Sequence, residues 1–169
     1  MRKIIFQLFI VTVLVSCNQQ EVKESSYNIL NEKDRAILRD EIIEDRFNNL
    51  LPKLMDETNI DMWVVISREY NEDPVIKTML PSVWLNARRR TILVFYRDKA
   101  KNTIEKLAVA RYDVGKNIKS AWNKEEEPNQ WKALNRIIEE RNPTKIGVNI
   151  SKHFALADGL VKTDHDKKP

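Results

Sequence analysis

The residues best suited to acid–base chemistry lie together in one short polar segment, Ser67–Asp73. Glu69 with Glu72 or Asp73 could serve as a paired acid and base, because carboxyl groups exchange protons. Arg68 could hold an anion through its guanidinium group. The simpler alternative, which we favour, is a hydrated loop in which Asp73 caps a following helix, since exposed charges on loops contribute little energy.

A second candidate combines an aromatic residue with a run of cations, Trp84 followed by Arg88, Arg89 and Arg90. Such a surface could bind phosphate, an acidic partner or single-stranded nucleic acid. Three consecutive arginines cannot all lie on one face of a regular helix or strand. We therefore expect a solvated segment or a subunit contact here, because Arg and Trp recur at protein interfaces.

The sequence lacks the motifs of a self-contained catalytic centre. It contains no GxSxG nucleophile elbow, no P-loop and no GxGxxG motif. Cys17 is the only cysteine, and His153 and His165 are the only histidines, which leaves too few ligands for a Cys/His zinc module. We therefore expect no catalytic residue, no metal ligand and no cofactor in this chain.

The composition fits one globular domain and gives no support for nucleic-acid binding. The chain has 169 residues, of which 42% are hydrophobic and 32% charged. Its net charge is +4, and two of its basic residues, Arg2 and Lys3, lie in a segment with the pattern of an export signal. The folded part is therefore less basic than the whole chain, and we expect no nucleic-acid partner.

The amino terminus is typical of an exported protein. Arg2 and Lys3 precede an apolar run that is shorter than the roughly 20 residues needed to span a bilayer. The sequence LVSC at residues 14–17 resembles the lipobox of bacterial lipoproteins, in which the cysteine is lipidated and the signal is cleaved before it. An ordinary signal peptide with a free Cys17 is the alternative.

The lipobox resemblance implies a chain anchored to a lipid bilayer through acylated Cys17, in the bacterial cell envelope, with its folded part outside the cytoplasm. Residues 1–16 would be the signal peptide, and the polar residues 17–28 a flexible tether. The folded domain is predicted over residues 29–161, and residues 162–169 are predicted to be a polar tail.

Hydrophobic periodicity predicts an α/β domain with a mixed β-sheet flanked by helices. Helices are expected over residues 31–59 with a break at Pro52, from Asp73 to Pro81, and from Pro128 to Asn142, with a last helical turn over 154–160. Strands are expected over residues 62–66, 91–96, 104–111 and 145–150. The short link between the second and third strands predicts an antiparallel hairpin.

The pattern of side chains also predicts what each element buries. The continuous apolar run over residues 62–66 predicts a strand buried on both faces. In the first helix Arg39, Asp40 and Arg46 are expected on the hydrated face. Three further tryptophans are expected in the core or at domain contacts: Trp63, Trp122 and Trp131.

Several segments together resemble one family of domains. They are residues 50–55 (LLPKLM), 60–65 (IDMWVV), 68–74 (REYNEDP), 90–96 (RTILVFY) and 146–149 (IGVN). They are similar to the N-terminal domain of the creatinase, prolidase and Xaa-Pro aminopeptidase superfamily of "pita-bread" metallopeptidases. The resemblance spans roughly residues 35–160 and implies an α/β domain with a mixed sheet.

The resemblance implies a non-catalytic chain. In the superfamily catalysis lies in a separate, following domain, which holds two divalent metal ions through two Asp, one His and two Glu, and no residue here matches those ligands. We expect the N-terminal domain of such a protein, truncated or split, serving oligomer contacts or substrate access. Its partner would be a second copy or a full-length homologue.

The resemblance also suggests which residues face that partner or a substrate, on the loop that starts at Arg68 and on the segment that ends at Arg90. These residues are Arg68, Glu69, Tyr70, Asp73, Trp84, Arg88, Arg89 and Arg90. Two alternatives remain open. The chain could belong to an active dinuclear-metal aminopeptidase completed by another chain, or it could be an envelope lipoprotein that binds peptides or proteins.

Overall fold

The computed structural model describes residues 29–69 and 72–149. The chain divides into two units, Met1–Leu30 and Asn31–Pro169. In the first unit only Ile29 and Leu30 are described, and both are exposed. The predicted signal, Cys17, the tether over 17–28, the turn over 154–160 and the tail over 162–169 all lie outside the described residues.

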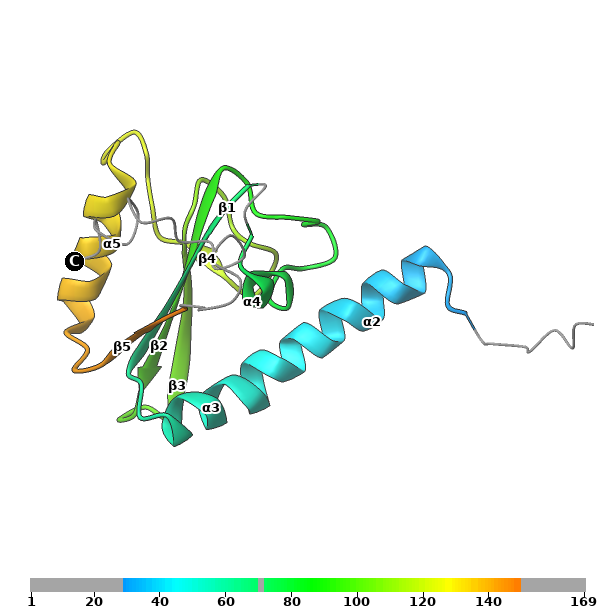
Figure 1. The fold of residues 1–169 in the computed structure, drawn as a ribbon, viewed down its shortest axis with the longest axis horizontal. Coiled ribbons are helices and arrows are strands. Elements are labelled where there is room, and N and C mark those ends of the chain that lie inside the picture. Colours follow the sequence, from blue (N-terminus) through cyan, green and yellow to red (C-terminus); the bar gives the residue numbers. More distant parts are fainter. Residues whose placement is uncertain (1–28, 70–71, 150–169) are drawn as a thin grey trace, which may run out of the picture. The chain divides into compact units, whose positions relative to one another are not determined.

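The second unit contains a five-stranded mixed sheet and helices on both of its faces (Figure 1). The helices are α2 (Glu32–Asp45), the π-helix η1 (Arg46–Leu50), α3 (Leu51–Glu57), α4 (Pro74–Lys77) and α5 (Gln130–Arg141). The strands are β1 (Met62–Arg68), β2 (Arg90–Asp98), β3 (Thr103–Val109), β4 (Lys119–Ser120) and β5 (Ile146–Val148). The prediction of an α/β domain with a mixed sheet is confirmed.

The strand order is β4-β3-β2-β1-β5. β2 pairs antiparallel with both β1 and β3, whereas β5 pairs parallel with β1 and β4 pairs parallel with β3. Four strands therefore run in one direction, and β2 runs against them. The predicted β2–β3 hairpin is confirmed, and its turn contains Asn102 in a left-handed conformation with φ 52°.

The strand over residues 62–66 is buried on both faces, as predicted. Val65 packs under η1 and α3, in a core with Phe47, Leu51 and Met55. On the opposite face Val64 packs in a second core, whose helix residues, Ala133, Leu134 and Ile137, come from α5. Apolar side chains that alternate between two covered faces account for the continuous hydrophobic run.

Pro52 marks a restart of the first helix, as predicted. The backbone changes to a π-helix over Arg46–Leu50, and α3 then begins at Leu51 with Pro52 in its first turn. Proline lacks an N–H to donate to the preceding turn, and a first-turn position removes the need for one. Pro52 therefore sits where its missing donor costs least.

The hydrated face predicted for the first helix is wrong for three residues. The guanidinium of Arg46 donates to the carbonyl oxygen of Thr78 at 2.8 Å, and Arg39 donates to that of Lys77 at 3.3 Å. Asp40 accepts hydrogen bonds from Ser82. Carbonyl groups at the end of a helix have no partner within that helix, so those at the end of α4 accept hydrogen bonds from the two arginines.

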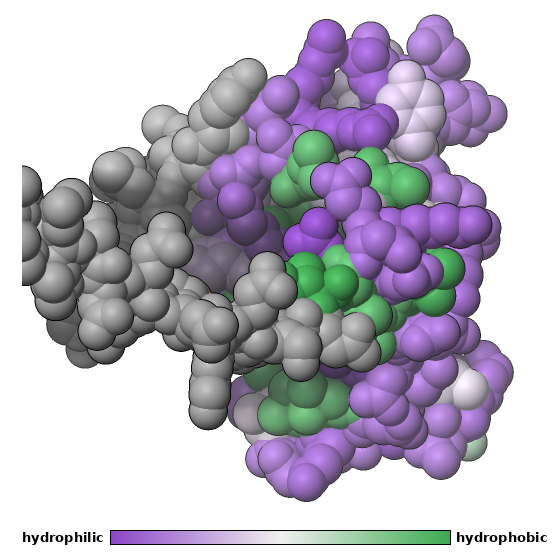
Figure 2. All heavy atoms as spheres, turned by 90° about the vertical axis from the view of Figure 1, so that its right-hand side faces the viewer, coloured by the Kyte–Doolittle hydropathy of each residue, from purple (hydrophilic) through white to green (hydrophobic). Residues whose placement is uncertain are grey.

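The outer side of the same helices exposes apolar residues instead. Leu38, Ile42, Leu50 and Leu54 are each exposed by more than 40%. Figure 2 looks onto the side of the molecule where α2 begins, and it shows separate apolar groups among hydrophilic residues. Among the described residues, no helix is long and apolar enough to cross a bilayer.

Two predicted helix boundaries are wrong, and one strand was not predicted. α5 begins at Gln130, because Asn129 caps it by accepting a hydrogen bond from the backbone N–H of Trp131, and Pro128 lies before the cap. α4 ends at Lys77, short of Pro81. β4 comprises only two residues, which is too short for a hydrophobic pattern.

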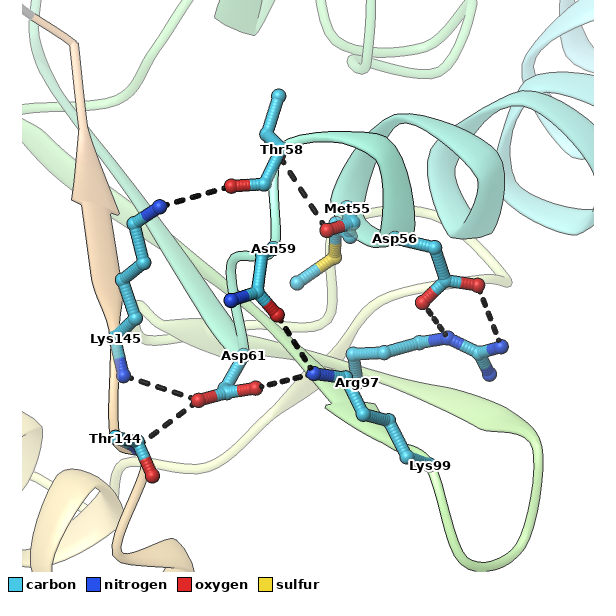
Figure 3. Close-up of polar contacts among 9 residues, drawn as sticks. All are labelled: Met55, Asp56, Thr58, Asn59, Asp61, Arg97, Lys99, Thr144 and Lys145. Carbon is cyan, nitrogen blue, oxygen red and sulfur yellow. Dashed lines mark hydrogen bonds and ion pairs between the residues drawn. The ribbon is translucent and has the colours of Figure 1, made fainter.

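A polar cluster joins the amino ends of β1 and β5 to the carboxyl end of β2 (Figure 3). Asp61 accepts hydrogen bonds from the Lys99 ammonium at 2.9 Å and from the backbone N–H groups of Thr144 and Lys145 at 3.1 and 3.0 Å. Nearby, Arg97 binds both carboxylate oxygens of Asp56 at 3.0 Å. This cluster pins the loop before β5 to the sheet.

The polar cluster predicts a loss of stability in acid. The hydrogen bond from Lys99 lowers the pKa of Asp61, and the hydrogen bond from Arg97 lowers the pKa of Asp56. A carboxylate whose pKa is lower in the folded state stabilises the fold above its unfolded pKa of about 3.9 and loses that contribution as the pH falls through the folded value. Urea unfolding should therefore show a lower free energy of unfolding at about pH 3 than at about pH 7.

Asp61→Asn provides the control for this prediction. The variant should be less stable than the wild type at neutral pH, and its stability should fall less on acidification because one titrating carboxylate has been removed. An equal fall in both proteins would show that Asp61 does not contribute to the pH dependence.

Candidate functional site

A cleft opens at the end of the sheet opposite the polar cluster. There the carboxyl ends of the like-directed strands meet the amino end of β2, the kind of edge at which ligands often bind in open α/β sheets. The cavity measures about 330 Å³. Its wall is formed largely by cationic and aromatic side chains: Arg88, Arg89, Arg90, Arg111, Trp84, Tyr112 and Trp122.

The three consecutive arginines all line this cleft, which is possible because they do not lie together in one regular helix or strand. Arg89 has a left-handed backbone with φ 53°, which breaks the regular alternation of side chains just before β2. Glu69 holds this turn: its backbone N–H donates to the carbonyl oxygen of Arg89 at 2.7 Å, and its carboxylate accepts from the N–H of Arg89 at 3.2 Å. The backbone N–H of Arg88 donates to the Thr91 hydroxyl at 3.1 Å.

Aromatic rings support two of the guanidinium groups. Arg88 lies 4.4 Å from the centroid of the Trp84 ring, and Arg90 lies 4.9 Å from that of Trp131 in α5. A cation at this distance from a ring face is attracted by the ring quadrupole. Trp84 is only 5% exposed and belongs to the core beneath α2, so it forms a wall of the cleft rather than a projecting surface group.

Charge distinguishes this cleft from a larger depression at the other end of the sheet. The larger depression, about 580 Å³, is lined by both acidic and basic residues. In it Arg141 pairs with both carboxylate oxygens of Glu105, at 2.5 and 2.7 Å. None of the described residues lining the arginine cleft is an Asp or a Glu. The arginine cleft is therefore the better anion site.

The loop after β1 places its candidate residues at two separate points. Arg68 lies opposite Arg90 in the β1–β2 ladder, and Glu69 contacts the Arg89 backbone beside the cleft. Asp73 caps α4 by accepting from the backbone N–H of Val75 at 2.7 Å, which confirms the cap, but the predicted hydration is wrong for this residue because Asp73 is only 2% exposed. Tyr70 lies outside the described residues.

The carboxylate of Asp73 also ties the loop to β5. Its second oxygen accepts a hydrogen bond from the side-chain amide of Asn149 at 2.6 Å, and its backbone N–H donates to Ser67 at 3.1 Å. Glu69 is thus hydrogen-bonded to the segment before β2, whereas Asp73 is hydrogen-bonded to α4 and to Asn149 after β5. Within residues 29–69 and 72–149, no three His, Cys, Asp or Glu residues form a group that could hold a metal ion.

Six residues that line the cleft were not among the candidates from the sequence: Thr91, Ala110, Arg111, Tyr112, Trp122 and Gln130. The predicted third strand included residue 111, whereas β3 ends at Val109 and leaves Arg111 and Tyr112 exposed in the following turn. Gln130 donates to the carbonyl oxygens of Arg90 and Val109, and so links the first turn of α5 to β2 and β3. The sequence did contain one indication of this site: a basic and an aromatic residue, Arg111 and Tyr112, lie at the end of a predicted strand and directly after it.

The arrangement can bind an oxyanion through guanidinium groups and stack a flat group against rings. The described part of the chain brings no nucleophile together with a base at this cleft. No family model, curated protein or solved structure matches the chain.

Proposed function

We propose that this chain is a non-catalytic, membrane-tethered binding domain, like the N-terminal domain of an Xaa-Pro aminopeptidase. Its partner is a second polypeptide, either a full-length homologue or another copy of the chain, bound through the face around the arginine cleft. The single observation that carries this proposal is the gathering of Arg88, Arg89, Arg111 and Tyr112 around one cleft.

The composition of this face supports protein binding. Arg, Tyr and Trp are enriched at protein interfaces and at the residues that dominate their binding energy. Arg88, Arg89 and Arg111 are exposed, and Tyr112 is 61% exposed. The backbone N–H groups of Arg88 and Arg89 donate to the Thr91 hydroxyl and the Glu69 carboxylate, which holds the arginine backbone in place and reduces the entropy lost on binding.

The tether and the fold support the remaining parts of the proposal. Acylation of Cys17 would keep the domain at the surface of an envelope membrane and so raise its effective concentration toward other anchored chains. The mixed sheet with helices on both faces agrees with the fold class of the superfamily's N-terminal domain. The two divalent metal ions of the superfamily would then belong to the partner's catalytic domain and not to these residues.

Association with a homologue tests the proposal. The full chain in a non-ionic detergent is mixed with a full-length Xaa-Pro aminopeptidase homologue from the same bacterium, and binding is followed by sedimentation velocity. Replacing Arg88 and Arg89 together with Ala should raise the dissociation constant at least about tenfold, because interface arginines contribute about 2 kcal/mol or more where they dominate binding. The melting temperature should fall only slightly, since both side chains are exposed and the contact of Arg88 with the Trp84 ring contributes about 0.5–1 kcal/mol.

The matched control removes the same charge from exposed residues outside the cleft, Lys33 and Lys53. Their replacement with Ala should leave the dissociation constant within about twofold, because exposed charges far from an interface are screened. Equal weakening by both double variants would assign the effect to net charge and overturn the proposed surface. If the chain associates neither with the homologue nor with a second copy of itself, the proposed partner is wrong.

A peptidase assay separates this proposal from the alternative of an enzyme completed by another chain. The purified chain, supplied with Mn²⁺ or Co²⁺, should release no amino acid ahead of proline above a blank prepared from cells that lack it. Metal-assisted hydrolysis needs a complete ligand shell, and no residue here matches the ligands of the superfamily. If activity appears only when a second chain is added, the alternative is correct.

A further inference from the structure

We infer that the arginine cleft is a binding site for an oxyanion, a carboxylate or a phosphate, carried on a single flat apolar group. The inference concerns the contents of the cleft and does not require the association proposed above. A small anion could bind in the cleft of a chain that never meets a homologue.

Three exposed cationic side chains around one cavity supply the anion-binding part: Arg88, Arg89 and Arg111. Each guanidinium presents N–H groups in a planar fork that matches two oxygens of a carboxylate or a phosphate. Arg88 is held against the Trp84 ring, so less side-chain freedom is lost when an anion binds. The described lining residues include no Asp or Glu, and the nearby Glu69 carboxylate accepts a hydrogen bond from the backbone N–H of Arg89.

The aromatic walls and the size of the cavity define the rest of the ligand. The indole N–H of Trp122 donates to the carbonyl oxygen of Glu127 at 2.7 Å, so this ring offers the cleft an apolar surface rather than a hydrogen bond. Tyr112 lies at the same cavity and is 61% exposed. A volume of about 330 Å³ is near the lower limit of small-molecule sites, about 300 Å³, which suits one ring that bears one anionic group.

The architecture behind the cleft keeps its two sides at a fixed separation. One side of the cleft contains Arg90, at the start of β2, and the other contains Arg111, which comes directly after β3. The Gln130 side chain donates to a carbonyl oxygen of each of these two strands. A ligand held between the arginines therefore meets a preformed site.

Calorimetric titration of the full chain in non-ionic detergent tests the inference with four probes: phenyl phosphate, benzoate, inorganic phosphate and benzyl alcohol. Phenyl phosphate or benzoate should bind, inorganic phosphate should bind at least about tenfold more weakly because it lacks a ring, and benzyl alcohol should give no heat because it lacks a charge. The better of the two ring probes identifies phosphate or carboxylate as the natural group.

Replacing Arg88 and Arg89 together with Gln should weaken the better probe by about ten- to a hundredfold, the range expected for lost charge-assisted hydrogen bonds. Replacing Lys33 and Lys53 with Gln removes the same charge and should leave the affinity unchanged. Raising the salt concentration should weaken binding in the wild type, because mobile ions screen the arginines.

The inference is overturned if neither ring probe binds at millimolar concentration, if benzyl alcohol binds as well as benzoate, or if the arginine variant binds as tightly as the wild type. Anion binding without association to any homologue would contradict the proposed function and support this inference. Association that depends on Arg88 and Arg89, with no anion binding, would support the proposed function and contradict this inference.

Discussion

Phe95→Ala is expected to lower the free energy of unfolding by about 3–5 kcal/mol, the usual range for removing a buried phenyl ring. Phe95 is fully buried in the central strand β2. Its ring lies 5.6 Å from that of Phe47 in η1 and 6.1 Å from that of Trp63 in β1. The substitution therefore leaves a cavity where the sheet meets the first helices.

Urea unfolding followed by circular dichroism measures this effect. A loss of this size is a large part of the roughly 5–15 kcal/mol that stabilises a typical domain, so the variant should be partly unfolded at physiological temperature. Leu54→Ala is the control, because Leu54 is 41% exposed and its truncation should cost less than about 1 kcal/mol. Similar losses in the two variants would contradict the packing described around Phe95.

Trp84→Ala is expected to cause the second large effect, a loss of about 3–5 kcal/mol together with damage to the cleft. Trp84 packs in the core beneath α2, and the same ring supports the Arg88 guanidinium. Removing it should lower the melting temperature and weaken any ligand that Arg88 holds. Thermal unfolding and a binding titration on the same sample report the two effects.

Trp84→Phe separates the two roles of this residue. A phenyl ring retains much of the buried apolar surface, so the free energy of unfolding should fall by less than in Trp84→Ala. Phe is a weaker cation–π partner than Trp, so binding should still weaken. A Phe variant that is as unstable as the Ala variant, with unchanged ligand affinity, would show that the ring acts only in the core.

Four of the five strands and the β2–β3 hairpin could be predicted from the sequence, because their signal is local. The continuous apolar run at residues 62–66 predicts a strand covered on both faces, residues 91–96 predict a second strand, and the short polar link after it predicts a hairpin. β4 carries no such signal. Lys119 and Ser120 become a strand only because β3 lies beside them.

The faces of the first helix could not be predicted, because they depend on a distant partner. Arg39 and Arg46 look like solvent-facing charges in the sequence, yet they meet carbonyl oxygens of Lys77 and Thr78 from α4. Leu38 and Ile42 remain exposed on the outer side. The arginines and the carbonyl groups that they bind are more than 30 residues apart in the sequence. The hydrophobic pattern of the first helix therefore gives no sign of these contacts.

The candidate cleft could be predicted only in part. The sequence pointed to Trp84 and the three arginines, but an argument from regular geometry separated the arginines. That argument does not apply, because the backbone at Arg89 is left-handed rather than regular. The turn at Arg89 is held by Glu69, which lies 20 residues earlier in the sequence. Arg111 and Tyr112 join the cleft because β2 and β3 are neighbours in the sheet.

Hydrogen–deuterium exchange on the full chain, with and without the full-length homologue, tests the central claim most directly. The account predicts slower exchange on mixing in the backbone amides of residues 84–90 and 111–112, with little change in α3 or at the polar cluster around Asp61. Protection confined to the outer side of α2 and α3, with none around the arginines, would contradict it.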